Sequence, residues 1–154
     1  MPMTDRRLAI DAWESLFRAQ HEIFGEISGD FVDAPLEQDE YDVLLTVVRA
    51  PEMTARLRDV TRNLLISQPS VSRLVDRMVT RGLVTKCPDP EDGRGSLVRA
   101  TAQGARAFRS LGAQHARTIV DRMSTLDDAE LQALLALTTK LREPACPTEL
   151  GETA

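Results

Sequence analysis

The chain has 154 residues, of which 42% are hydrophobic and 28% are charged, a balance typical of one globular domain. No apolar run approaches the roughly 18 residues that cross a bilayer, and the N-terminus lacks the apolar core of a secretory signal, so we expect neither a membrane protein nor a secreted one. The formal net charge of −5 argues at first against a nucleic-acid partner, because nucleic acids are themselves negatively charged.

The first part of the chain has the apolar spacing of helices. A long helix is predicted over residues 6–30, followed by shorter helices at about 37–49 and 55–65. Pro51 ends the second of these, because proline cannot continue a helix. The apolar stripe of the first helix consists of Ile10, Trp13, Phe17, Phe24, Ile27 and Phe31.

A fourth helix is indicated by its end signals. Ser67 is a good N-cap, and Pro69 falls in the first turn, where its missing N–H costs little. The helix runs to about Arg81, and Gly82 suits the left-handed position just beyond a helix end. Its expected buried face consists of Val71, Leu74, Val75 and Met78.

After this helix the apolar period changes to that of strands. Residues 83–87 and 96–100 read as two short strands, and the sequence PDPEDGRG between them predicts a hairpin with a long exposed tip.

Two more helices complete the pattern. Thr101 can cap a helix over about 102–124. Asp127 and Glu130 form a capping box for the last helix. Residues 143–154 show no periodicity and are expected to be a flexible tail.

Two short helices joined by a tight turn and followed by a hairpin are the arrangement of a winged helix-turn-helix, whose second short helix enters the major groove of DNA. We therefore predict a mainly α protein with a small β-hairpin wing, in one domain over residues 1–142. Its DNA-binding lobe lies at about 54–101, between helices at about 6–30 and 102–142.

The distribution of charge agrees with a DNA partner. Residues 54–106 contain ten Lys and Arg and five Asp and Glu, a local net charge of +5, whereas the rest of the chain has a net charge of −10. A basic middle segment suits phosphate binding. The alternative is a solvated basic face with no partner.

Three stretches carry a family resemblance, at residues 67–78, 81–84 and 88–104. They resemble, in order and spacing, the recognition helix, the turn into the wing, and the wing with the start of the next helix in the MarR family of bacterial transcription regulators. The resemblance implies a homodimer that binds a palindromic operator in double-stranded DNA. The family's wing usually has two arginines after an aspartate, but here Gly93 stands in place of the first.

The polar face of the recognition helix supplies the expected DNA contacts. It presents an amide, hydroxyls and guanidinium groups, which read base edges and hold phosphates. We assign Gln68, Ser70 and Arg73 to bases, and Ser72 and Arg77 to phosphates.

The wing supplies one further expected contact. Arg94 can enter a narrow minor groove, where negative potential is focused, with Asp92 orienting it. For Asp76 we favour a salt bridge within its helix or between helices over a role in DNA binding.

Dimerisation and ligand binding are assigned to the terminal helices. The resemblance implies small aromatic acids or phenols as ligands, and Trp13, Phe17, Arg18 and His21 could form such a site. The alternative is that these residues are dimer core with a solvated Arg18. Candidate dimer residues, chosen by pattern alone, are Leu8, Leu111, Ile119, Leu131, Leu135 and Leu141.

These observations favour a cytoplasmic repressor that is not an enzyme and is released from DNA by a ligand. Two cysteines and two histidines are too few for a disulfide framework or a dedicated zinc cluster, and we expect no metal or cofactor. Two alternatives stay open: a winged-helix protein-interaction module, and a redox-sensing regulator of the same fold that uses Cys87 or Cys146.

Overall fold

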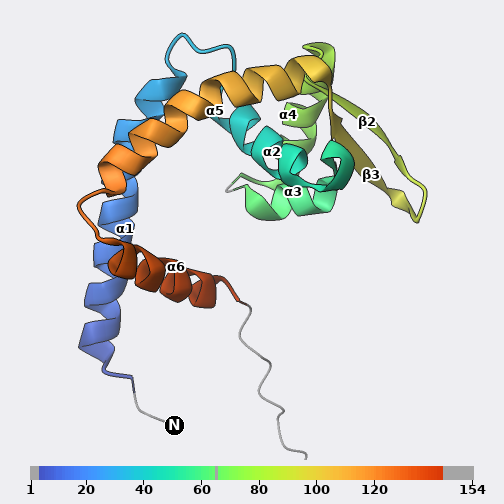
Figure 1. Cartoon of the computed structure of the whole chain (residues 1–154). Coiled ribbons are helices and arrows are strands. Elements are labelled where there is room, and N and C mark those ends of the chain that lie inside the picture. The colour runs from blue at the N-terminus through green and yellow to red at the C-terminus, as the bar shows by residue number, and fades with distance from the viewer. Residues whose placement is uncertain (1–3, 65, 144–154) are drawn as a thin grey trace, which may run out of the picture. The chain divides into compact units, whose positions relative to one another are not determined.

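The computed structural model describes residues 4–64 and 66–143, apart from the side chain of Gln68. The chain divides into two compact units, Met1–Ile119 and Val120–Ala154, with the boundary inside a helix. None of the described helices is long and apolar enough to cross a membrane. The elements are, in chain order (Figure 1), α1 (Arg6–Ile27), the 3-10 helix η1 (Ser28–Phe31), α2 (Gln38–Arg49), the 3-10 helix η2 (Pro51–Met53), β1 (Thr54–Arg56), α3 (Leu57–Asn63), α4 (Gln68–Thr80), β2 (Val84–Asp89), β3 (Asp92–Ala100), α5 (Ala102–Met123) and α6 (Asp128–Arg142).

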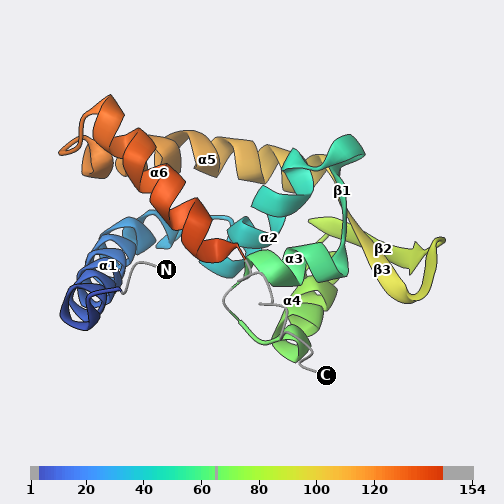
Figure 2. The ribbon, with the colours of Figure 1, turned by 90° about the horizontal axis from the view of Figure 1, so that it is seen from below.

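The strands form one antiparallel sheet in the order β1-β3-β2. β2 and β3 make a hairpin that projects from the neighbouring helices, and β1 adds a short edge strand beside β3 (Figures 1 and 2). We call β2, β3 and the turn between them the wing. Together with α3 and α4 this sheet confirms the predicted mainly α, winged helix-turn-helix fold.

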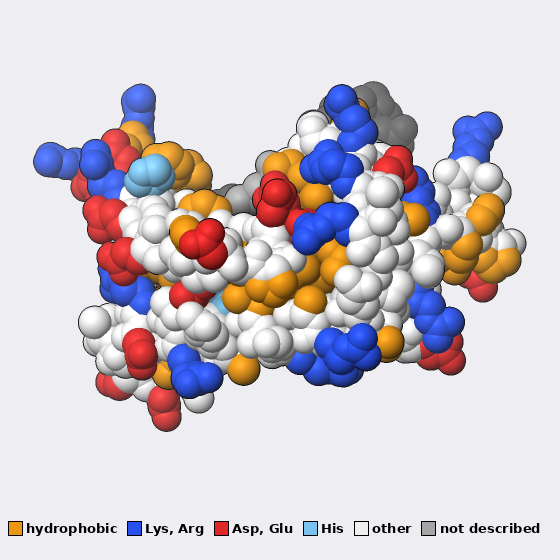
Figure 3. All heavy atoms as spheres, turned by 90° about the horizontal axis from the view of Figure 1, so that it is seen from above, with side chains coloured by type: hydrophobic (Ala, Val, Ile, Leu, Met, Phe, Trp, Pro, Cys, Tyr) orange, Lys and Arg blue, Asp and Glu red, His pale blue; other side chains and the backbone are white. Residues whose placement is uncertain are grey.

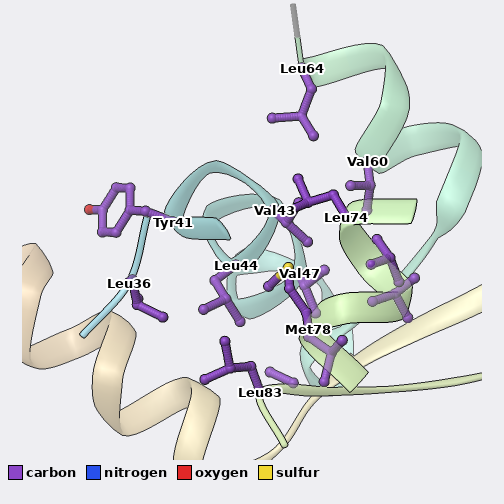
Figure 4. Packing of buried hydrophobic residues seen from close by; sticks show 14 of the residues in the cluster. Leu36, Tyr41, Val43, Leu44, Val47, Val60, Leu64, Leu74, Met78 and Leu83 are labelled. Atoms are coloured by element: carbon purple, nitrogen blue, oxygen red, sulfur yellow. The ribbon is translucent and has the colours of Figure 1, made fainter. Parts of the chain in front are cut away.

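The core of the first unit lies between α2, α4 and the base of the wing. Side chains of α4 point toward those of α2, and Leu83, just before the wing, packs against the same cluster (Figure 4). Val71, Val75 and Met78 are completely buried, and Leu74 is nearly so. The predicted inner face of the recognition helix is therefore confirmed, and the rest of the helix is left to face solvent.

Several predicted boundaries were wrong. The helix predicted at about 55–65 begins at Leu57, because residues 55 and 56 belong to β1. The first helix ends as α at Ile27 and continues as η1. The wing strands are longer than predicted, with Asp89 paired to Asp92, so that the turn is short. Leu111, a candidate dimer residue, is 7% exposed and packs in the core of its own protomer.

A buried polar cluster ties α5 to the segment after α1. The His115 Nδ1 atom lies 2.8 Å from an Asp30 carboxylate oxygen, and Thr118 donates a hydrogen bond of 3.0 Å to the other oxygen. The rings of Phe31 and Tyr41 meet the imidazole edge to face. Burial raises the pKa of Tyr41, with Arg49 acting in the opposite direction, so the phenol stays neutral at physiological pH.

Asp42, the residue after Tyr41 on α2, has a carboxyl group whose pKa is raised. Burial is the main cause that raises the pKa of Asp42, Asp39 adds to the shift, and His115 opposes it. Desolvation disfavours the charged form of a carboxyl group, which is the physical reason for this direction.

The junction between the wing and α5 is closely packed. The Thr101 hydroxyl donates to the Gly82 carbonyl oxygen and accepts the Gly104 N–H, so the predicted cap of α5 is confirmed. Gly82 has φ +75°, the left-handed conformation expected of it. A Cβ atom built on Gly104 would lie 2.0 Å from the Leu83 carbonyl oxygen, so only glycine fits there.

We expect Gly104→Ala to lower the free energy of unfolding by about 1–3 kcal/mol, because the added methyl group pushes α5 away from the backbone of Leu83. Urea denaturation measures the change. The matched control is Gly25→Ala in α1, where an added Cβ meets no atom within 4 Å; it should instead stabilise by about 0.5–1 kcal/mol through helix propensity. Equal effects of the two substitutions would contradict this reading of the junction.

Candidate DNA-binding surface

The outer face of α4 carries the residues that the sequence assigns to DNA. Arg73 and Arg77 are exposed, whereas Ser70 and Ser72 are half-buried. The side chain of Gln68 lies outside the described part of the structure. In the space-filling view, Lys and Arg side chains project at several places on the surface, including the upper centre and the right of the picture (Figure 3).

The structure brings three of these residues together. Ser70, Arg73 and Arg77 line a hollow of about 420 Å³ beside α4, to which Asp39 contributes from the first turn of α2. Ser72 does not line this hollow. The Arg73 Nε–H donates to the Pro69 carbonyl oxygen at 3.3 Å, and the hydroxyls of Ser67 and Ser70 lie 3.0 Å apart. Ser67 is the N-cap residue, but its hydroxyl meets Ser70 instead of capping the helix backbone.

An ion pair at the end of α4 was missed by sequence reasoning. The guanidinium of Arg81, the C-cap residue, contacts both carboxylate oxygens of Glu40. It also donates a hydrogen bond of 2.9 Å to the Pro35 carbonyl oxygen. The Glu40 side chain is 3% exposed and also accepts the Glu37 N–H in the capping box of α2. This clamp fixes the C-terminal end of α4 to the start of α2. A contact between residues 41 apart in sequence has no local signal.

The wing shows a similar use of charge. Asp76 pairs with Lys86 of β2 at 3.0 Å, so its salt bridge reaches a strand and is not intrahelical or interhelical. An Asp92 carboxylate oxygen accepts the Arg94 N–H at 3.1 Å. Asp92 therefore orients the backbone that carries Arg94, whose side chain is exposed.

The residues assigned to ligand binding lie together on α1. The ring centroids of Trp13 and Phe17 are 5.9 Å apart, and those of Phe17 and His21 are 6.5 Å apart in a stacked arrangement. All four, including Arg18, are exposed. Trp13 is 62% exposed, so this row of side chains is an open surface in the protomer.

The redox alternative named Cys87 and Cys146, and the structure describes the first of them. Cys87 is exposed on β2. Cys146 lies outside the described residues.

Comparison with known proteins finds a family that resembles the middle of the chain. The sequence profile of the MarR family matches residues 35–95, which include α2, α3, α4 and most of the wing. The matched segment has 61 of the chain's 154 residues, so the match shows similarity to the MarR family over this part of the chain. That family consists of transcription regulators and not of enzymes, which agrees with the resemblance seen in the sequence.

Individual relatives agree with this family in fold. An HTH-type transcriptional regulator of Mycobacterium bovis is 24% identical over 132 residues, which are 85% of this chain and 87% of the relative. The crystal structure of Sco3205, a MarR family regulator of Streptomyces coelicolor in complex with DNA, superposes with a TM-score of 0.79 at 19% identity, covering 97% of this chain and 94% of that one. CouR of Rhodococcus jostii, bound to p-coumaroyl-CoA, gives 0.77 at 22% identity, covering 94% and 100%. These likenesses show the winged-helix fold.

We expect Arg81→Met to lower the free energy of unfolding by about 1–3 kcal/mol, because it leaves the buried Glu40 carboxylate without its charged partner. Thermal or urea unfolding measures this. The double variant Arg81→Met, Glu40→Gln should recover part of the loss, since a neutral amide costs less to bury than an unpaired charge. A double variant no more stable than Arg81→Met alone would show that the pair does not hold the end of α4.

Proposed function

We propose that this chain is a homodimeric repressor that binds a palindromic operator through two copies of α4 and leaves it when a small aromatic acid or phenol binds. The observation that carries the proposal is a protomer with two unlike surfaces. One is the polar outer face of α4, and the other is a set of apolar side chains that the protomer leaves uncovered. A regulator acting on the chromosome would work in the cytoplasm.

The uncovered apolar surface supports a dimer. No side chain of α1 or α6 is buried in the protomer. Soluble monomers rarely leave so many large apolar side chains in water, and a closed two-fold dimer is the commonest way to cover them. The exposed residues on these helices are Leu8, Ile10, Trp13, Phe17 and Phe24 of α1, with exposed fractions of 45–66%, and Leu135, Leu137 and Leu141 of α6, with 62–72%.

Two-fold symmetry has a consequence for DNA. A dimer presents two recognition helices, and a palindromic operator offers two matching half-sites about one helical turn apart. In each half-site Gln68, Ser70 and Arg73 would meet bases, while Ser72 and Arg77 hold phosphates. Arg94 would reach the adjacent minor groove.

The ligand part of the proposal rests on the aromatic row of α1. Trp13 and Phe17 offer apolar walls, and Arg18 or protonated His21 would offset the cost of burying a carboxylate. Because these side chains are open in the protomer, a second subunit must complete the pocket. CouR, which shares the fold, binds an aromatic acyl thioester, p-coumaroyl-CoA. If the residues serve only packing in the dimer, no ligand will bind there.

Selection from a library of random-sequence duplexes tests the DNA part. We expect the protein to enrich an inverted repeat, as a dimer requires. Arg73→Ala should weaken binding to the selected duplex by ~1–3 kcal/mol while changing binding to a scrambled duplex far less, because a base contact carries sequence information. Enrichment of a single half-site would contradict binding by a dimer with two recognition helices. Equal losses of affinity for both duplexes would show that Arg73 contacts phosphates and not bases.

Fluorescence of Trp13, the one tryptophan of the chain, tests the ligand part. Titration with benzoate-like and hydroxycinnamate-like acids should change its emission and weaken binding to the selected duplex by about 1–3 kcal/mol. DNA should in turn lower the affinity for the ligand by the same factor. Arg18→Gln is the matched variant, since it keeps the apolar wall and removes the charge that meets a carboxylate. Binding that leaves DNA affinity unchanged would keep the pocket and reject its regulatory role.

A further inference from the structure

An ion-pair network joins the edge strand β1 to the turn of the wing. The Arg56 Nε atom lies 2.9 Å from an Asp89 carboxylate oxygen, and an Arg56 terminal nitrogen lies 2.5 Å from the Glu91 carboxylate. Asp89 is 3% exposed, whereas Glu91 is 78% exposed. Arg56 thus reaches from the last residue of β1 across to the turn that follows β2.

The buried carboxylate organises this turn. One oxygen of Asp89 receives Arg56, and the other accepts the Glu91 N–H at 2.9 Å. Asp89 also pairs across the hairpin with Asp92, at a register shift between Pro88 and Asp89. Asp92 in turn accepts the N–H of Arg94. The contacts therefore run without interruption from Arg56 to the backbone of Arg94.

The turn contains two glycines, so the contacts of Asp89 and Asp92 are needed to restrain it. Gly93 lies in open space, with no atom within 4 Å of an added Cβ, so packing does not restrain the chain there. At Gly95 an added Cβ would lie 3.3 Å from an Asp92 oxygen and 3.5 Å from the Asp89 Cβ. Two glycines beside Arg94 raise the entropic cost of ordering the turn on DNA. A turn already held by Asp89 and Asp92 has less freedom to lose.

We propose that Arg56 is a positioning residue for DNA binding: through Asp89 it holds the wing turn in the conformation that presents Arg94. This inference rests on the proposed contact of Arg94 with DNA. Arg56 has its guanidinium occupied by two carboxylates and acts through the turn. Removing Arg56 leaves a buried carboxylate without its cation, and the turn must open to hydrate it.

Four variants separate this role from an effect of charge alone. Arg56→Met removes the guanidinium and keeps much of the apolar stem. Glu91→Gln breaks only the exposed ion pair and leaves Arg56 on Asp89. Arg58→Met is the charge-matched control, because Arg58 is exposed and lines the same hollow of about 210 Å³ beside the wing. Asp89→Asn cuts the same link without leaving a buried charge, and serves if Arg56→Met does not fold.

Hydrogen exchange of the free protein is the first readout. The Glu91 and Arg94 amides, which donate to Asp89 and Asp92, should exchange about tenfold faster in Arg56→Met and Asp89→Asn, because the turn opens more often. Glu91→Gln and Arg58→Met should leave these rates within about twofold, and amides in the middle of α4 should not change in any variant. Unchanged turn amides in both Arg56→Met and Asp89→Asn would overturn the inference.

Binding to a random-sequence duplex of roughly 30 base pairs is the second readout, since wing contacts also act in non-specific binding. Arg56→Met should lower affinity about fivefold in the native background and less than about twofold in Arg94→Ala, whereas Arg58→Met should act equally in both backgrounds. Equal losses from Arg56→Met in both backgrounds would overturn the positioning role. In a third outcome, Arg94→Ala itself leaves the affinity for DNA unchanged while the turn amides still respond to Arg56→Met. That result would contradict both the proposed contact of Arg94 with DNA and the role of Arg56 in positioning it.

Discussion

The packing of α4 against α2 is the constraint on which the rest of the lobe depends. Val71, Val75 and Met78 are completely buried, so the rotation of α4 about its own axis is fixed by the core. Since side chains on a helix keep fixed angular positions, this rotation alone points Arg73 and Arg77 outward. The exposure of the residues that we propose to contact DNA is thus a consequence of apolar burial on the opposite side of one helix.

Charge pairs then fix what apolar packing leaves free. A helix locked in rotation can still tilt at its end, and Arg81 prevents this by holding Glu40 and the Pro35 carbonyl oxygen. The wing is two strands with little core of its own, and it is joined to the lobe by the pairs Lys86–Asp76 and Arg56–Asp89. In each case a residue outside the expected DNA contacts holds a segment that carries an expected contact residue. Glu40, Asp76 and Asp89 therefore act as structural partners of basic residues in the lobe.

The sequence predicted what depends on local pattern. The buried stripe of α4, the left-handed Gly82, the Thr101 cap and the capping box of Asp127 and Glu130 were all correct, because each is set by residues within one or two helical turns. β1 was missed because three residues give too short a period, and its strand state comes from pairing with β3, more than 40 residues away. The network from Arg56 to Asp89 was missed for the same reason. Of the candidate site, the sequence named the side chains, while the hollow beside α4 that joins Ser70 to Asp39 required the fold.

The central claim is that two copies of α4 read the major groove of one operator. Methylation interference on the selected duplex tests it directly, because methylation of guanine N7 blocks the major groove and methylation of adenine N3 blocks the minor groove. The account predicts two clusters of interfering guanines, centred about 10 base pairs apart, with weaker minor-groove interference beside each from the wing. Interference confined to adenine N3, or a single guanine cluster, would contradict it.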